Sequence, residues 1–222
     1  MKDQSIPSWS LPSALAVGGA GFSVLVVSLL LMYSIGKTAY SMLHFSVSEG
    51  SATTTIVSCV IAVGAGALVA RWLANITLSS LWQSVEWRPS GGKTAFLGFL
   101  GFLGFFLMKS AMTGEMISPP WNVQITLPFI LAIVSTVLVQ PLMEELYFRG
   151  ILYAGLTSKM GWLPSIVIVT LLFVMVHGLY QWVYILPLSI ALAFVRVGTK
   201  STANCFALHA AYNLGVVMWA IG

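Results

Sequence analysis

The sequence predicts an all-α fold, a polytopic membrane helix bundle with about seven transmembrane helices. Of the 222 residues, 58% are hydrophobic and only 7% are charged, whereas a soluble domain carries about 25% charged residues. The apolar runs are long and continuous, unlike the alternating segments of a transmembrane β-barrel. Because backbone groups in hydrocarbon must be satisfied internally, these runs predict helices. We expect residues 1–222 to form one integral membrane domain.

Seven apolar segments are candidates for membrane spans, and six or eight are the alternative counts. The first is long enough to cross a bilayer and is expected to be a retained helix, because a secretory signal would have a shorter apolar region after a basic start. The segments lie at about residues 14–35, 54–73, 94–108, 123–157, 161–177, 182–197 and 203–220.

The third segment carries a stripe of glycines. Gly98, Gly101 and Gly104 recur at every third position. Small residues on one face of a membrane helix let a second helix approach closely. The stripe therefore predicts a tightly packed neighbour.

The fourth segment is the longest. It is apolar from about Val123 to Val139 and continues through charged residues to about Thr157. At ~1.5 Å per residue, this stretch exceeds one bilayer thickness. It is therefore either one long tilted helix or a helix broken near Pro141.

The remaining segments have recognisable boundaries. Gly161 and Pro164 open the fifth segment, and Pro187 lies inside the sixth, where we expect a kink or an interruption. A polar turn at 198–202 precedes the last segment.

The basic residues predict the orientation in the membrane. With the N-terminus in the cytoplasm, most of them would lie on inside loops, as the positive-inside rule requires. We therefore expect a multi-pass protein of a bacterial inner (plasma) membrane, with the lipid bilayer as a partner. The net charge of +4 is spread over short loops, so nothing supports nucleic-acid binding. The inside residues would be Lys2, Arg71, Arg88, Lys93, Lys159, Arg196 and Lys200, against Lys37 and Lys109 outside.

Two of the six carboxylates stand side by side in the fourth segment, at Glu144 and Glu145, with Arg149 one helical turn further on. Burying a charge in hydrocarbon costs at least about 2.5 kcal/mol, so such residues are functional candidates. Glu145 and Arg149 are four residues apart and can pair along one helix face. Glu144 has no cation on its own helix and is the candidate general base. A buried ion pair that only holds helices together would explain Glu145 and Arg149, but not the second acid.

Two histidines also lie in apolar runs. His177 ends the fifth segment, and His209 lies four residues before Asn213 in the last one, so His209 and Asn213 project to the same side. Both can donate hydrogen bonds to an oxyanion. The alternative is interhelical hydrogen bonding, worth about 1 kcal/mol or less. A helical hairpin that turns near Lys159 would bring Glu144 and His177 to a similar depth.

These motifs resemble those of the CPBP family of intramembrane proteases, the CAAX protease and bacteriocin-processing group that includes the Ras-converting CAAX endopeptidase. The resemblance covers about residues 123–221, which we take as the motif-bearing core. It implies an intramembrane endopeptidase that hydrolyses a peptide bond in a membrane-associated or lipidated substrate. The motifs are Glu144-Glu145-x-x-x-Arg149, Phe173-x-x-x-His177 and His209-x-x-x-Asn213.

The resemblance also implies roles for the residues. Glu144 with His177 would activate a water molecule, and His209 with Asn213 would stabilise the tetrahedral oxyanion. The Glu145–Arg149 pair would orient the base. The expected partner is a peptide or protein substrate in or at the membrane.

Three alternatives remain open at this point. Glu144, His177 and His209 could hold zinc with a fourth position open for water, although a His-Glu-x-x-His motif is absent and we favour a mechanism without metal or other cofactor. The protein could be a non-catalytic immunity or scaffold protein of the same fold, which would have no use for these polar residues together. A proton-coupled transporter is disfavoured, because no inverted repeat is visible.

Overall fold

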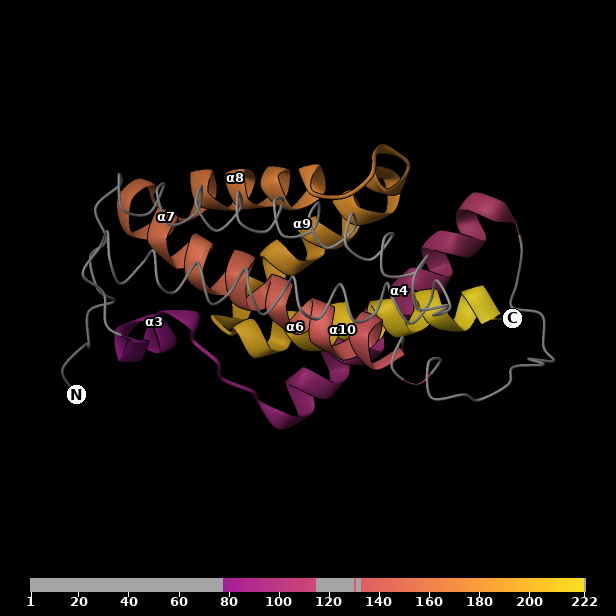
Figure 1. The fold of residues 1–222 in the computed structure, drawn as a ribbon, viewed down its shortest axis with the longest axis horizontal. Coiled ribbons are helices and arrows are strands. Elements are labelled where there is room, and N and C mark those ends of the chain that lie inside the picture. Colours follow the sequence, from indigo (N-terminus) through magenta and orange to yellow (C-terminus); the bar gives the residue numbers. More distant parts are fainter. Residues whose placement is uncertain (1–77, 115–129, 131–132, 222) are drawn as a thin grey trace, which may run out of the picture.

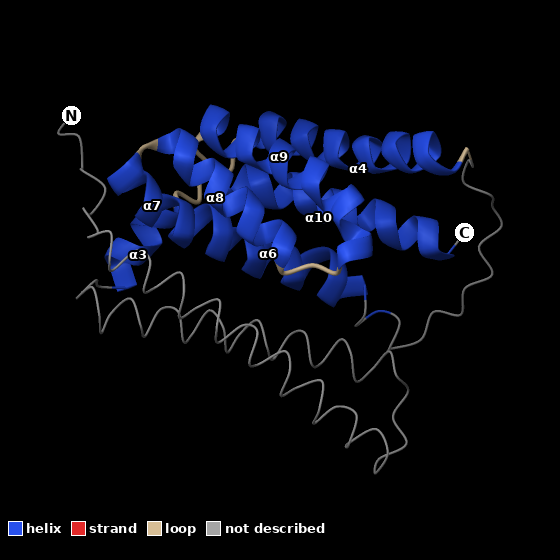
Figure 2. Ribbon diagram, turned by 90° about the horizontal axis from the view of Figure 1, so that it is seen from above, coloured by secondary structure: helices blue, strands red, loops and turns tan. Residues whose placement is uncertain are grey.

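The computed structural model describes residues 78–114, 130 and 133–221. Every regular element in this part of the chain is a helix (Figure 2), which confirms the all-α class. The first two predicted spans and the predicted position of the N-terminus lie outside the described residues. The elements in chain order are α3 (Leu78–Val85), α4 (Gly91–Thr113), the π-helix η1 (Ser135–Val139), α6 (Gln140–Glu145), the π-helix η2 (Leu146–Leu152), α7 (Tyr153–Met160), α8 (Trp162–Met175), the 3-10 helix η3 (Leu179–Gln181), α9 (Trp182–Thr199) and α10 (Thr202–Ile221).

Helices α4 and α10 pack against each other along their length, and both extend to the same end of the long axis in Figure 1. The glycine stripe of α4 explains how closely they approach. A Cβ atom at Gly101 would overlap the backbone carbonyl of Leu208, and one at Gly98 would lie 3.6 Å from the carbonyl oxygen of Ala207. A Cβ atom at Gly104 would meet no atom of the described residues within 4 Å. The predicted close neighbour is therefore α10, and two of the three glycines contact it.

The fourth segment does not break at Pro141. The backbone stays in the right-handed helical region from Val134, through η1, α6 and η2, to Tyr153. A proline inside a helix lacks one N–H and its ring crowds the carbonyl four residues earlier. The wider π turn of η1 lies directly before Pro141 and leaves room for that carbonyl. Of the two alternatives, the structure shows the continuous helix.

The last three long helices begin and end close to the predicted positions. Helix α8 ends at Met175, so His177 lies just beyond its C-terminus. Helix α9 runs through Pro187 without the interruption that the sequence suggested as one possibility. The turn before α10 is short, because Lys200 caps α9 in the left-handed conformation.

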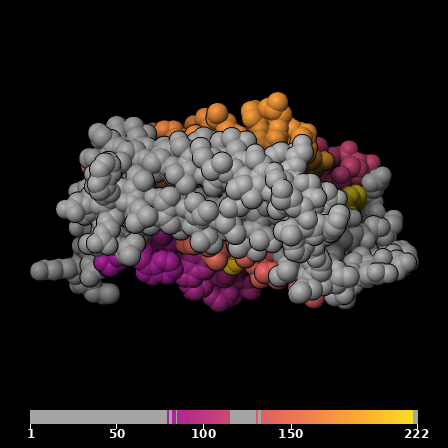
Figure 3. Space-filling model, viewed as in Figure 1, coloured from indigo at the N-terminus to yellow at the C-terminus, as the bar shows by residue number. Residues whose placement is uncertain are grey.

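Two helical stretches among the described residues are long and apolar enough to cross a membrane, Gly91–Thr113 and Leu179–Thr199, and α8 is a shorter apolar helix. Their outer faces carry large exposed hydrophobic side chains such as Phe99 of α4, Leu171 of α8 and Phe194 of α9. In space-filling form, the orange residues of the α8–α9 region form the upper edge of the molecule and the magenta residues of α3 and α4 the lower edge (Figure 3). In a membrane, lipid chains would cover these apolar faces.

Two apolar clusters hold the helices together. One joins η2, α7 and α8 around Phe148, Leu156 and Phe173, all fully buried. The other joins α4, α9 and α10 around Phe105 and Leu192. The side chains that the sequence singled out lie between these clusters.

Candidate active site

A cavity of about 400 Å³ opens between α4, the η1–α6 helix, the start of α9 and α10. Four of the six predicted site residues line it, although they come from three separate segments of the chain. They are Glu144, His177, His209 and Asn213. Glu145 and Arg149 are buried and reach the cavity only through His209.

The Glu145–Arg149 pair has the geometry expected for residues four apart on a helix. Arg149 Nη1 lies 3.2 Å from Glu145 Oε1, and both side chains are almost completely buried. The guanidinium also donates from Nη2 to Ser189 Oγ (2.9 Å), and it stacks 4.1 Å from the centre of the Phe173 ring. A buried charge is tolerated when it is paired and hydrogen-bonded in this way.

His209 connects that ion pair to the cavity. Its Nδ1 lies 2.8 Å from Glu145 Oε1. A carboxylate oxygen accepts hydrogen bonds, so Nδ1 is the donor and Nε2 is the nitrogen turned toward Glu144. Nε2 is 3.7 Å from Glu144 Oε2, too far for a direct hydrogen bond.

The two neighbouring glutamates therefore lie in different surroundings. Glu144 Oε1 accepts a hydrogen bond from Gln140 Nε2 at 2.9 Å. Its other oxygen, Oε2, is buried and has no hydrogen-bond partner among the described residues, which is also true of Glu145 Oε2. Glu144 remains 16% exposed while Glu145 is fully buried, so Glu144 is the carboxylate that can reach a reactant.

His177 lies across the cavity on the short link between α8 and η3. Its Nδ1 is 2.7 Å from the carbonyl oxygen of Phe173, and that oxygen only accepts, so Nδ1 carries a proton. In the neutral ring, Nε2 is then the acceptor. No hydrogen bond joins His177 to Glu144 within the described part of the chain. The two residues line the same cavity.

Asn213 lies one turn after His209 on α10. Its Nδ2 donates to the carbonyl oxygen of Thr136 in η1 at 2.9 Å. This bond fixes the amide at the cavity wall and uses one of its two N–H groups. The expected placement of His209 and Asn213 on one face of α10 is present.

Sequence reasoning missed several polar side chains that line the same cavity, and Gln140, Lys109 and Tyr212 are among them. For Gln140 a signal exists, because it precedes Glu144 by four residues. Tyr212 follows His209 by three residues, which is also a helix-face spacing. Lys109 was interpreted as a basic residue flanking a span that ends at 108, but α4 continues to Thr113 and carries it into the cavity.

The possible metal ligands do not form a cluster. Among the residues that the structure describes, no group of three His, Cys, Asp or Glu side chains is arranged to hold a metal ion. Glu144, His177 and His209, which the zinc alternative requires as ligands, therefore do not form such a group. The donor set in this arrangement does not fit a zinc site with three protein ligands.

Comparison with known proteins identifies the same part of the chain. Residues 126–215 match the family model described as type II CAAX prenyl endopeptidase Rce1-like. No curated protein and no solved structure gives a significant match. The matched segment contains all six residues singled out from the sequence and lies within the predicted core at 123–221. Over residues 126–215, the chain is therefore similar to the Rce1-like type II CAAX prenyl endopeptidases, a family of membrane proteases.

Proposed function

We propose that this protein is an intramembrane endopeptidase that hydrolyses a peptide bond in a membrane-associated or lipidated protein, with Glu144 as the general base. The family match implies a peptidase and a peptide or protein substrate at the membrane. The observation that carries the proposal is the state of Glu144. One of its oxygens is held by Gln140, and the other is without a partner among the described residues, in a cavity shared with two histidines.

In the first step, Glu144 Oε2 takes a proton from a water molecule while the water oxygen attacks the scissile carbonyl carbon. His177 Nε2 accepts the second hydrogen of that water and holds it in place. The carbonyl π electrons move to its oxygen, which becomes the oxyanion of a tetrahedral intermediate.

In the second step, the intermediate collapses. His209, with both ring nitrogens protonated, donates from Nε2 to the oxyanion, and Asn213 donates through its remaining N–H. The carbon–nitrogen bond then breaks, and Glu144 returns its proton to the leaving amine. The products are a new carboxylic acid, which then releases its proton to solvent, and a new amine, and Glu144 is regenerated.

The Glu145–Arg149 pair acts as a positioning unit in this proposal. Glu145 holds His209 by Nδ1 and thereby turns Nε2 toward the cavity. Arg149 pairs with Glu145 and holds it in place. This extends the role implied by the family resemblance, in which the pair orients the base.

The decisive experiment uses Glu144→Gln and His177→Ala in the full chain, with cleavage of a membrane-bound reporter peptide as the readout. Loss of general-base catalysis typically lowers the rate by about 10²–10⁴-fold. Both variants should accumulate and unfold at temperatures close to that of the wild type. Full activity of Glu144→Gln would overturn the proposal and favour a binding or scaffold role.

We also propose that catalysis needs no metal ion. The purified protein should then contain zinc well below one equivalent and keep its activity after exhaustive chelation. Loss of activity on chelation, with recovery on adding zinc, would establish the metal-dependent alternative instead.

The same proposal places the chain in a bacterial inner membrane as a multi-pass protein with a cytoplasmic N-terminus. The excess of Lys and Arg on the loops assigned to the inside supports this orientation. Reporter fusions after residues 90 and 114 should report opposite sides of the membrane, because α4 separates them. The orientation predicts a cytoplasmic signal after residue 90 and an outside signal after residue 114, and the reverse pattern would contradict it.

A further inference from the structure

His177 lies on a link between two helices and not on a helix itself. Helix α8 ends at Met175 and η3 begins at Leu179, so His177 belongs to neither. Backbone bonds fix the direction of a side chain within a helix, whereas a residue beyond the last turn needs other contacts to keep its direction. A residue that holds a reacting water must stay within about 0.5 Å of its productive place. The position of His177 therefore depends on the bonds that this link makes.

Contacts from α8 hold His177 on one side. Its Nδ1 lies 2.7 Å from the carbonyl oxygen of Phe173, and the centres of the two rings are 4.9 Å apart. The backbone N–H of His177 donates to the carbonyl oxygen of Val174 at 3.1 Å. Both partners belong to α8. These contacts decide which ring nitrogen is free, but they do not fix His177 relative to the other walls of the cavity.

The indole of Trp182 connects His177 to the next helix. Its Nε1 donates to the backbone carbonyl oxygen of His177 at 3.0 Å. Trp182 is the first residue of α9, and α9 packs against α10 in the cluster that contains Leu192 and Leu208. Helix α10 carries His209. The indole bond therefore fixes His177 relative to the two helices that form the other walls of the cavity.

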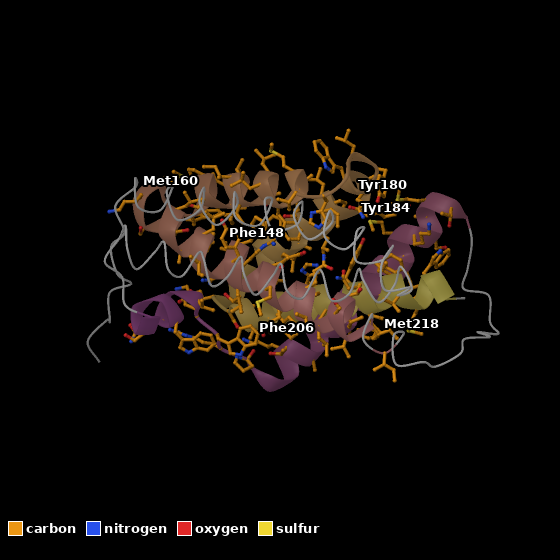
Figure 4. All side chains as sticks on the ribbon, in the orientation of Figure 1. Phe148, Met160, Tyr180, Tyr184, Phe206 and Met218 are labelled. Atoms are coloured by element: carbon orange, nitrogen blue, oxygen red, sulfur yellow. The ribbon has the colours of Figure 1, made fainter. Side chains whose placement is uncertain are left out.

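The simpler explanation is that the indole only satisfies a carbonyl group beyond a helix end. The surroundings of the link argue against it. Leu179 and Tyr180 are 77% and 81% exposed, and Tyr180 lies at the end of the α8–α9 hairpin away from Met160 (Figure 4). At such an exposed end, water would serve the carbonyl equally well. Tryptophan near a membrane surface usually directs its N–H to water or headgroups, whereas Trp182 directs it to His177.

We propose that Trp182 is a positioning residue for catalysis, which holds the backbone of His177 so that Nε2 of that histidine stays directed at the attacking water. The inference rests on the proposed function, because it requires His177 to hold this water for Glu144. Without the indole bond, the link can move away from the cavity wall, and the water is held correctly for a smaller fraction of the time. The bond makes no contact with substrate, so its loss lowers kcat and leaves KM nearly unchanged.

Trp182→Phe in the full chain tests the proposal, because phenylalanine keeps an aromatic ring and removes the N–H. We expect kcat for a membrane-bound reporter peptide to fall by about 2- to 10-fold, the factor that one neutral hydrogen bond contributes. KM and the temperature of unfolding should stay close to those of the wild type, since Trp182 is partly exposed. Trp162→Phe is the matched control, because Trp162 is an exposed tryptophan at the first position of α8, at the other end of the hairpin. It should leave kcat unchanged.

A double-mutant cycle separates positioning of His177 from a general effect on the fold. In a His177→Ala background, Trp182→Phe should cause no further fall in the remaining rate, because the residue that it positions is absent. An unchanged kcat in Trp182→Phe, a rise in KM alone, or an equal fall in both backgrounds would overturn the proposal. Full activity of His177→Ala would refute the proposed function itself, whereas a slow His177→Ala with an unchanged kcat in Trp182→Phe would refute only the role of Trp182.

Discussion

At the scale of single residues, the difference between Glu144 and Glu145 comes from their partners. Both glutamates belong to α6, and their side chains point in different directions because neighbouring helical residues are rotated by about 100°. Glu145 meets Arg149 and His209 and is fully buried. Glu144 meets Gln140 and the cavity. Gln140 thus occupies one carboxylate oxygen of Glu144 and leaves the other without a hydrogen bond among the described residues.

We therefore expect Gln140→Leu to lower kcat/KM by about tenfold or more, since a hydrogen bond to a charged group contributes about 1.5–3 kcal/mol. Leucine has a similar volume, so the temperature of unfolding should change little. Steady-state kinetics of peptide cleavage measure the effect. Gln181→Leu is the control, because Gln181 lines the same cavity and bonds to Gly178 instead of Glu144. Equal losses in the two variants would remove Gln140 from the proposed mechanism.

At the scale of the elements, the approach of α4 to α10 decides the shape of the cavity. Gly101 lets the two helices touch through their backbones, and Phe105 then fits over Gly215 and Tyr212. The same approach brings Lys109 across to Trp219. A residue larger than glycine at position 101 would push α4 away and widen the cavity.

Gly101→Ala should destabilise the protein by about 1–3 kcal/mol, the usual cost of overpacking. Thermal unfolding in detergent measures it. Gly104→Ala is the matched control on the same helix, because a Cβ there meets nothing within 4 Å among the described residues. It should be neutral or stabilising by up to about 1 kcal/mol, because alanine has the higher helix propensity. Similar losses at the two positions would contradict the packing described here.

At the scale of the whole molecule, one buried arginine joins distant parts of the chain to the site helix. Arg196 donates from Nε to the carbonyl oxygen of Arg149 (2.8 Å) and from Nη2 to Glu86 Oε2 (2.6 Å). Glu86 adopts a left-handed conformation with φ of 50°, which costs about 1 kcal/mol or more. Its carbonyl oxygen accepts a hydrogen bond from the backbone N–H of Thr202. These contacts hold the link between α3 and α4 against the start of α10.

Replacing Arg196 by methionine should therefore destabilise the protein by at least about 2 kcal/mol, since it leaves Glu86 and a buried carbonyl without their donor. Arg88→Met is the control, because Arg88 is 72% exposed and lies 3.9 Å from the same carboxylate. An exposed pair contributes about 0–1 kcal/mol, so that variant should unfold near the wild-type temperature. A similar decrease in the unfolding temperature of both variants would contradict this account.

The candidate site was predictable where its contacts are local. The Glu145–Arg149 contact and the shared face of His209 and Asn213 follow from a four-residue spacing, because the helix period alone brings such side chains together. The course of the chain at Pro141 was not predictable, since the accommodating π turn depends on the packing of the residues before it.

The sequence by itself determined that the described part of the chain is helical, because the pattern of apolar residues is a local property. It also determined which charged residues are candidates for chemistry, because the cost of burying a charge in a membrane applies to each residue separately. Only the tertiary structure decided which candidates meet. The bond between His209 and Glu145 spans 64 residues, and Lys109 reaches rings on two later helices. These contacts depend on the angle and position at which the helices cross, and packing along the full length of each helix sets both.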